Sequence, residues 1–574
     1  MTMSLSSGFA GFFWRFVAAP VAVMAFLVPV HAEPGKASAM FAPLPVVGSR
    51  DVMSIEPQIT RPDTPYCTVE LFPDHEFDGP AVRQVIDYAP PVGCPGPWSR
   101  VVLEADFSVS AGQQFDRTVR VRLGEVNILT GTTVEPARRQ GATWHVERDL
   151  TDYSALLRQP EKGDAELLNI VTDQNNGRIK GAARLVFYKA APGAQAPDVP
   201  DIVLPLDKDP VFLTASSPVL KSELSLPRNV TRLMLDVLAM PQQVDEFWYM
   251  CMPIHYTPEM NAAQDRTCGI PFRETEVRVD GILAGIAPVF PWIYTGGFNA
   301  MLWKQIPGIE TLNLHPYRVD LTPFAGRLND GRPHHIDLSV VGARRYVVMT
   351  GTLLAWRDPG RQVVNGELVR SSGKTAAITV HQDIPVQKNG TGKYTTRADQ
   401  AVEAVGYVET SHGRVETSVS QKMSFENAYA RTDGGSSIVQ INRLTTRHDQ
   451  QDLQGHRGYT VAERFPLTVR QGKSGAGTEP AYTLNVQQGL IREMAGTWPE
   501  NITPQMRLFI DATAVTGAGR NGALTEHRSN TSEAWLQMGD GRSRCHELAV
   551  KSLNDVIVSV KDDAECREIP QQEP

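Results

Sequence analysis

The residues best suited to chemistry lie between Leu226 and Trp303, where acidic side chains stand directly beside large aromatic ones. The run at 245–249 reads Asp-Glu-Phe-Trp-Tyr, and the phrases Phe-Arg-Glu at 272–274 and Phe-Pro-Trp at 290–292 follow. A carboxyl group packed against an apolar wall has a raised pKa, and this composition suits sugar binding or acid–base chemistry. Ordinary loop acids beside core aromatics are the alternative interpretation.

A second candidate acid, Asp116, stands just before the strand-like run 118–123, between Phe115 and Arg117. An acid at the entrance of a strand can serve as a general acid or base. The alternative is a surface aspartate paired with Arg117. Arg273 and Glu274 pose a similar choice, because they either pair with each other or, if buried, clamp a polar group of a substrate.

The motifs that the sequence lacks exclude several other chemistries. There is no G-x-S-x-G elbow, no H-E-x-x-H motif and no Walker-type loop. No C-x-x-C spacing occurs, so a metal site is not expected. The formal net charge of -8 argues against a nucleic-acid partner, which needs clustered Lys and Arg.

The N-terminal residues 1–32 have the character of a signal peptide. They contain no Asp or Glu, and Arg15 is their only Lys or Arg. An apolar run at 16–30 ends in an A-x-A-like cleavage site that closes on Ala32. An uncleaved anchor is the alternative, but no second apolar segment is long enough to span a bilayer. We therefore expect a secreted or periplasmic protein that has no membrane contact once the signal is removed.

Six cysteines fit an oxidising compartment. Sequence alone permits many pairings, but nearest neighbours along the chain would close three modest loops in three different domains. The expected structural disulfides are Cys67 with Cys94, Cys251 with Cys268, and Cys545 with Cys566.

The chain of 574 residues is too long for a single core, and its pattern is that of an all-β protein. Short runs alternate apolar and polar residues between Gly, Pro and Asn turns, which is typical of sandwiches and jelly rolls. We expect two jelly-roll-like β-sandwich domains in tandem and a further β-rich C-terminal domain. The predicted parts are a signal peptide (1–32), a linker (33–64), a first jelly roll (65–190), a Pro-rich linker (191–213), a second jelly roll (214–359) and the C-terminal domain (360–574).

A series of phrases in fixed order resembles a known family, the acid peptide:N-glycanases called peptide-N-glycosidase A. Weaker similarity continues through 405–427 and the C-terminal cysteines. The phrases are Gln-Phe-Asp-Arg at 114–117, Val-Glu-Pro at 134–136, Trp-His-Val-Glu-Arg-Asp-Leu-Thr at 144–151, Leu-Pro-Arg-Asn-Val at 226–230, Asp-Glu-Phe-Trp-Tyr at 245–249, Pro-Phe-Arg-Glu at 271–274, Tyr-Thr-Gly-Gly at 294–297 and Leu-Thr-Pro-Phe at 321–324.

This resemblance implies an enzyme that hydrolyses the amide between the innermost N-acetylglucosamine and asparagine in N-linked glycopeptides or glycoproteins. The asparagine would become aspartate, and the released glycosylamine would lose ammonia. The resemblance also implies acid tolerance and no metal or other cofactor. We expect the protein to be a monomer.

The site residues follow from a more distant resemblance to the bacterial peptide:N-glycosidase F, which is built of two jelly rolls. Its first catalytic aspartate stands in a Trp-Asp-Arg phrase before a strand, which Asp116 matches. Its second catalytic acid precedes a Trp just before a Phe-Arg phrase. Glu246 takes this place if an insertion follows it, whereas direct counting lands on Gly269 and keeps Glu274 as a candidate. A third acid falls near Asp173.

The expected roles place one acid at the edge of each jelly roll, across an interdomain cleft. Asp116 would handle the proton transfers at the amide, and Glu246 or Glu274 would orient water or hydrogen-bond the sugar. The expected substrate-binding residues are Arg117, Asp173 and Asp245, the sugar-stacking Trp248 and Trp292, and Arg273, which would hold an amide or acetamido oxygen.

Two other functions remain open at this point. Jelly rolls host lectins as readily as enzymes, so a non-catalytic glycan-binding or adhesion protein is one alternative. A glycosidase that uses two carboxylates is the other, and it would leave a sugar on the asparagine.

Overall fold

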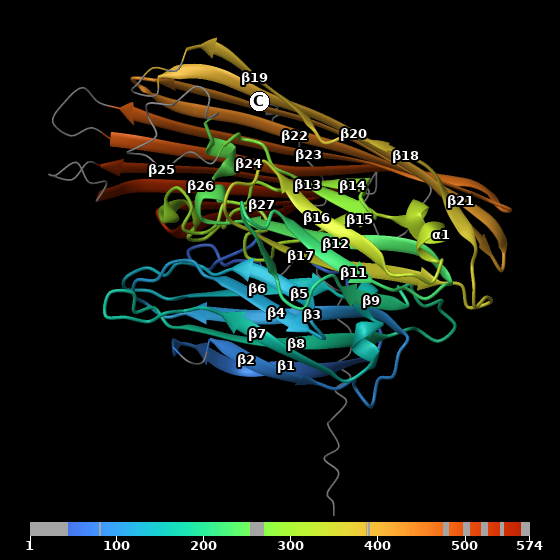
Figure 1. Ribbon diagram of the computed structural model, residues 1–574. Coiled ribbons are helices and arrows are strands. Elements are labelled where there is room, and N and C mark those ends of the chain that lie inside the picture. The colour runs from blue at the N-terminus through green and yellow to red at the C-terminus, as the bar shows by residue number, and fades with distance from the viewer. Residues whose placement is uncertain are drawn as a thin grey trace, which may run out of the picture.

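The computed structural model describes residues 44–563, apart from 80–81, 253–268, 386, 388–390, 475–480, 497–504, 518–525 and 540–544. Strands dominate these residues, so the predicted all-β class is confirmed. Three bodies are stacked: a first β-sandwich, a second β-sandwich and one large sheet (Figure 1). The predicted signal peptide lies outside the described residues, and no helix within them is long and apolar enough to cross a membrane.

The first sandwich consists of two four-stranded antiparallel sheets, in the orders β1-β8-β3-β6 and β2-β7-β4-β5. Their alternating side chains meet in one core, in which Phe77, Val121 and Phe187 are fully buried. The strands are β1 (Tyr66–Phe77), β2 (Arg83–Tyr88), β3 (Trp98–Val109), β4 (Thr118–Leu123), β5 (Val126–Thr132), β6 (Ala142–Asp149), β7 (Glu161–Leu167) and β8 (Ile179–Lys189).

The second sandwich pairs a sheet in the order β10-β17-β12-β15, with β9 also on β17, with a sheet in the order β11-β16-β13-β14. Its strands are β9 (Ile202–Pro205), β10 (Val211–Leu213), β11 (Val219–Leu224), β12 (Val230–Pro241), β13 (Glu274–Val279), β14 (Ile282–Pro288), β15 (Tyr317–Asp320), β16 (His334–Val341) and β17 (Val347–Arg357). A single helical turn, α1 (Ala325–Leu328), precedes β16. The two-sandwich arrangement agrees with the prediction, and the finer jelly-roll assignment remains a prediction.

The predicted linker at 191–213 is not wholly a linker, because it supplies β9 and β10. Both strands add to β17, opposite Thr352–Ala355 and Val347–Met349. Proline cannot donate to a ladder, and here Pro205 ends β9 while Pro210 precedes β10. The prolines therefore bound short strands rather than exclude them.

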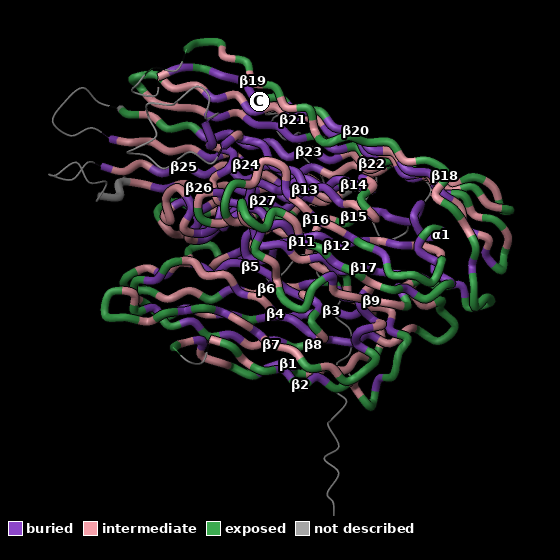
Figure 2. The backbone as a smooth tube through the Cα atoms, in the orientation of Figure 1, coloured by how far each residue is buried: buried purple, intermediate pink, exposed green. Residues whose placement is uncertain are grey.

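The C-terminal part forms an 11-stranded antiparallel sheet in which each strand from β20 to β28 follows its neighbour along the chain. Positive-φ glycines open β21 and β23, at Gly413 (φ 105°) and Gly455 (φ 120°). One face packs on the second sandwich and shares its core, which Figure 2 shows as buried backbone between the two bodies. The strands are β18 (Gly366–Gly373), β19 (Ala377–Ile384), β20 (Gly392–Thr410), β21 (Gly413–Thr432), β22 (Gly435–Asp452), β23 (Gly455–Ser474), β24 (Ala481–Gly496), β25 (Gln505–Gly517), β26 (Glu526–Gly539), β27 (Cys545–Leu553) and β28 (Val556–Asp563).

The predicted disulfide Cys67–Cys94 is present, with Cα atoms 6.1 Å apart. Cys251 is also disulfide-bonded, and its predicted partner Cys268 lies outside the described residues. Cys566 lies outside them too, so the third predicted bridge, with Cys545, stays a prediction.

A buried ion pair between Asp245 and Arg273 holds three segments of the second sandwich together. Both side chains are 0% exposed, with 2.7 Å between Arg273 Nη2 and Asp245 Oδ1. Asp245 also accepts the backbone N–H groups of 344–346, and Arg273 Nη1 donates to the carbonyls of Ile270 and Phe272. Side chains this enclosed cannot contact a substrate, so the pair is structural, contrary to the substrate-binding roles that we expected.

The Glu274 carboxyl is also enclosed, at 0% exposure, and neither of its oxygens has a hydrogen-bond partner among the described residues. Burial, with a contribution from the Glu276 charge, raises the pKa of Glu274 to about 8. Glu274, Glu276 and Arg278 share one face of β13, and Arg278 Nη2 lies 3.4 Å from Thr375 Oγ1 next to the large sheet. This location inside the protein excludes the catalytic role that we considered for Glu274.

The buried pair predicts a large loss of stability on removal of one partner. Arg273→Met leaves the Asp245 charge enclosed without its cation, so we expect the free energy of unfolding to fall by roughly 3–5 kcal/mol in urea titrations. Arg83→Met removes an exposed pair with Glu166 and should cost no more than about 1 kcal/mol. Equal unfolding midpoints for Arg273→Met and the wild type would contradict the structural role.

Glu274 predicts that stability declines as the pH rises. Between its ordinary pKa of 4.5 and the raised value of about 8, the folded state binds more protons than the unfolded state, so the stability present at low pH is lost through this window. Glu274→Gln cannot ionise and should be more stable than the wild type at pH about 9, by more than about 1 kcal/mol, but not at pH about 4. Parallel stability–pH curves for the two proteins would refute this assignment.

Candidate active site

Asp116 and Glu135 meet because the hairpin β4–β5 continues beyond its ends. Thr118 pairs with Thr132 in the ladder, and the Thr133 N–H then donates to the Arg117 carbonyl at 2.9 Å. The residue before Arg117 therefore lies opposite the residues after Thr133. This register places Asp116 beside Glu135, and both side chains are partly exposed.

Gly296, from the loop after β14 in the second sandwich, lies against both carboxyl groups. Thr295 Oγ1 donates to the Thr133 carbonyl at 2.6 Å and fixes this loop on the first sandwich. A Cβ atom added to Gly296 would lie 2.7 Å from Glu135 Oε1 and 2.8 Å from Asp116 Oδ1. Gly296 is thus the point at which the two carboxyl groups converge, and its missing side chain leaves them room.

Glu246 approaches from a different segment of the second sandwich. It follows the short helical turn 243–245 directly after β12, and its side chain is partly exposed. Gln242 Nε2 donates to Thr118 Oγ1 at 3.1 Å, which holds this segment on the start of β4. The structure therefore brings the predicted acids Asp116 and Glu246 into one neighbourhood, from two different sandwiches.

The three acids form an electrostatically coupled group, which we call the carboxyl cluster (Asp116, Glu135 and Glu246). Burial raises the pKa of Asp116, although the Gly296 N–H and the Arg117 charge favour its carboxylate. Burial, opposed by the Lys304 charge and reinforced by that of Asp116, raises the pKa of Glu135 to about 7. Burial and then the Asp116 charge raise the pKa of Glu246 to about 7. At mildly acidic pH the two glutamates are thus protonated, and burial raises the pKa of Asp116 beside them as well.

The aromatic side chains next to the cluster that remain open are phenylalanines rather than the predicted tryptophans. Phe115 is 50% exposed and directly precedes Asp116. Phe247 follows Glu246, is partly exposed and packs against Phe298 with ring centroids 5.3 Å apart.

Trp248 and Trp292 lie in the core instead. Trp248 is 1% exposed and packs on Phe425 of the large sheet, and Trp292 is 6% exposed beside Phe290. Neither ring presents a face on which a sugar could stack, so these two predicted roles are not supported.

Arg117 and Asp173 do not join the cluster directly. Arg117 Nη2 donates to Gln114 Oε1 at 2.8 Å, and no ion pair with Asp116 occurs within the described part of the chain. The alternative interpretation of Asp116 as a surface acid paired with Arg117 is therefore not supported. Asp173 lies exposed in the loop between β7 and β8, without a contact to the cluster among the described interactions.

Sequence reasoning missed Glu135, although Val-Glu-Pro at 134–136 was one of the matching phrases. The signal that could have found it is the register of the hairpin around Gly124 and Glu125. Counting outward from that turn sets Thr118 opposite Gly131, and the one-residue bulge between Val121 and Arg122 moves its partner to Thr132, which brings Asp116 next to Glu135.

The large sheet holds the segments that carry the site. Gln488 Nε2 donates to the Pro291 carbonyl while its Oε1 accepts the Ile309 N–H, both at 2.9 Å. Asn427 Nδ2 donates to the Tyr249 carbonyl at 2.9 Å, next to the Glu246 segment. These side-chain amides form hydrogen bonds with backbone N–H and C=O groups of the irregular loops, which have no neighbouring strand to pair with.

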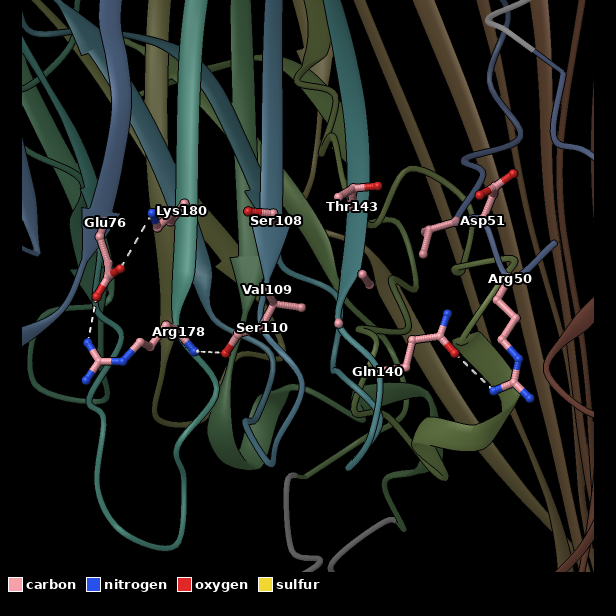
Figure 3. Close-up of a pocket in the computed structure, with 13 residues that line it drawn as sticks. Arg50, Asp51, Glu76, Ser108, Val109, Ser110, Gln140, Thr143, Arg178 and Lys180 are labelled. Atoms are coloured by element: carbon pink, nitrogen blue, oxygen red, sulfur yellow. Dashed lines mark hydrogen bonds and ion pairs between the residues drawn. The ribbon is translucent and has the colours of Figure 1, made fainter.

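Two cavities of the described structure lie apart from the cluster. A trough of about 470 Å³ crosses the first sandwich, where Arg178 and Lys180 turn toward Glu76 and Arg50 meets Gln140 (Figure 3). A groove of about 850 Å³ lies between the second sandwich and the large sheet, beside Trp356. Within the described residues, no three His, Cys, Asp or Glu side chains are grouped so as to hold a metal ion.

A comparison with known proteins finds a relative that is similar over most of the chain. A peptide-N4-(N-acetyl-beta-glucosaminyl)asparagine amidase A from Prunus dulcis is 27% identical over 537 residues, covering 88% of this chain and 91% of that protein.

Two solved structures are more distantly similar. PNGase F, a glycosylasparaginase from Flavobacterium meningosepticum, is 11% identical with a TM-score of 0.34 and covers 51% of this chain and 96% of its own. PNGF-II is 11% identical with a TM-score of 0.35, covering 52% and 66%. Scores this low locate no residue of this chain.

The model of one protein family matches residues 57–373. This match covers both sandwiches and more than half of the chain. The protein therefore belongs to the family of peptide N-acetyl-beta-D-glucosaminyl asparaginase amidase A.

Proposed function

We propose that the protein hydrolyses the amide between N-acetylglucosamine and asparagine in N-linked glycopeptides or glycoproteins. The observation that carries this proposal is the convergence of Asp116 and Glu246 from two sandwiches onto one partly exposed cluster. Family membership supports the choice of bond, because the relative from Prunus dulcis is named for this amide.

Asp116 performs the proton transfers. As water adds to the amide carbonyl carbon, the new C–O bond forms and the Asp116 carboxylate takes a proton from the water. When the C–N bond breaks, the leaving nitrogen takes that proton and the carboxylate is restored. The products are a glycosylamine and a peptide in which aspartic acid replaces asparagine.

Glu246 supplies a hydrogen-bond donor. An amide is a poor electrophile, so a donor to the carbonyl oxygen or to the sugar must hold the substrate in line with the water. Glu246 can donate only while it is protonated, and its raised pKa of about 7 keeps it so in mild acid. Phe115 and Phe247, the open aromatic side chains beside the two acids, offer apolar surface to the substrate.

Acid tolerance, metal independence and export are parts of the same proposal. Glu135 and Glu246 keep their protons at mildly acidic pH, and the scheme uses Asp116 as the carboxylate. Carboxyl groups handle every proton in the scheme, so it requires no metal ion. The signal-like residues 1–32 support secretion or a periplasmic location.

Incubation with a glycopeptide tests the activity. We expect mass spectrometry to find aspartic acid at the former glycosylation site with the wild type, and a kcat/KM about 10² to 10⁴ lower with Asp116→Asn. Glu70→Gln, an exposed acid on β1, should behave as the wild type. A sugar left on asparagine would identify a glycosidase, and an unchanged glycopeptide would identify a binding protein.

Glu246 predicts a change in the pH profile. In the wild type, kcat/KM should fall as the pH rises through about 7, because Glu246 loses the proton that it donates. Glu246→Gln keeps a hydrogen-bond donor that cannot titrate, so its kcat/KM should fall less steeply than that of the wild type as the pH rises. An unaltered pH dependence in this variant, measured with the same glycopeptide, would rule out the donor role.

A further inference from the structure

Glu135 is built into the same site as Asp116, and no role has been assigned to it so far. Lys304 Nζ donates to the carbonyls of Glu135 at 2.9 Å and Pro136 at 3.2 Å, which fixes the backbone at this point. The Asp116 backbone N–H favours the Glu135 carboxylate, so Glu135 is linked to the main chain of Asp116 as well as to its side chain. An acid merely exposed on a surface loop would have none of these contacts.

A Cβ atom added to Gly296 marks a point close to one oxygen of each carboxyl group. The same point in space lies 2.7 Å from Glu135 Oε1 and 2.8 Å from Asp116 Oδ1. Two carboxylates gathered around one residue repel each other, and a proton on one of them removes this repulsion. Oδ1 is the Asp116 oxygen nearest Gly296, which leaves Oδ2 for the substrate and water.

We propose that Glu135 is a positioning residue that shares one proton with Asp116 across Gly296. Protonated Glu135 holds Asp116 Oδ1, so that Oδ2 accepts and returns the proton of the attacking water. Glu135 itself keeps its proton through the cycle, so no atom or electron is gained or lost there. This role deepens the proposed amide hydrolysis and rests on it, but the proton sharing itself does not depend on any substrate.

The charged groups around Glu135 determine the pH range of the pair. Asp116 and Arg117 face it from the first sandwich, and Lys304 faces it from the second. Asp555, in the turn before β28 of the large sheet, acts on Lys304. The positive charges of Lys304 and Arg117 favour the Glu135 carboxylate. Burial and the Asp116 charge favour the protonated form more strongly and raise the pKa of Glu135 to about 7. The pair therefore holds its shared proton below about pH 7.

The first experiment is a double-mutant cycle in thermal melting, which needs no activity. We expect Asp116→Asn and Glu135→Gln each to raise the Tm at pH about 9, by about 2–4 °C, because either change removes the repulsion between two carboxylates. The double variant should gain no more than one single variant. At pH about 5, where the wild-type pair shares a proton, there is no repulsion to relieve and the gain in Tm from each single variant should vanish. Additive changes at both pH values would overturn the proton sharing.

The second experiment measures kcat/KM against pH for Glu135→Gln, with Glu70→Gln as the matched control. If Glu135 and Glu246 both need their protons, the wild-type activity falls with the loss of two protons near pH 7, and Glu135→Gln falls with the loss of one. If kcat/KM falls with rising pH in the same way in Glu135→Gln as in the wild type, Glu135 has no part in the reaction.

Gly296→Ala probes the same pair sterically. Its φ lies outside the left-handed range, so alanine fits the backbone, and the three atoms nearest the new methyl group belong to the two movable carboxyl groups. We expect kcat/KM to fall about 10²-fold with a Tm close to that of the wild type. Gly93→Ala, which meets nothing within 4 Å, is the control. Full activity in Gly296→Ala would overturn the positioning role. An inactive wild type would overturn the proposed function, and the thermal-melting experiment alone would then test the proton sharing.

Discussion

The candidate active site depends on the hydrogen-bonded seam between the two sandwiches. The chain that leaves β5 pairs with loops of the second sandwich: Thr132 N and Oγ1 donate to the Thr311 carbonyl, each at 2.9 Å, and Leu314 N donates to the Thr130 carbonyl at 2.8 Å. Each such bond contributes only about 1 kcal/mol, but together they fix one register. In that register Gly296 reaches Asp116 and Glu135, and a shift by one residue would separate the carboxyl groups.

The large C-terminal sheet contributes to function through the same constraint. Its strands supply no member of the carboxyl cluster, yet its side chains satisfy backbone groups in the loops that carry the cluster. Asn530 Nδ2 and Ser532 Oγ donate to the carbonyls of Met301 and Leu302, just before Lys304. A β-sandwich cannot extend its own ladders into irregular loops, so an added layer of amide and hydroxyl side chains provides the missing partners.

The sequence predicted much of the architecture, because alternation along each strand is a local property. The sequence also predicted that Asp116 and Glu246 lie near each other, since both stand next to a strand in phrases that resemble a known family. Burial by a distant part of the chain was not predictable. Glu274 and Glu276 alternate with apolar residues and look like a solvent face, but the large sheet covers that face. Asp245 and Glu246 are adjacent in sequence, yet one is enclosed by Arg273 and the other remains open.

The central claim is that two separate sandwiches contribute acids to a single chemical step. A double-mutant cycle in kcat/KM between Asp116→Asn and Glu246→Gln tests this claim most directly, because residues that act as a unit show strongly non-additive losses. If the acids act together on one amide, the double variant will be about as slow as the slower single variant. Losses that multiply in the double variant would show that the two acids act independently, and would contradict this account.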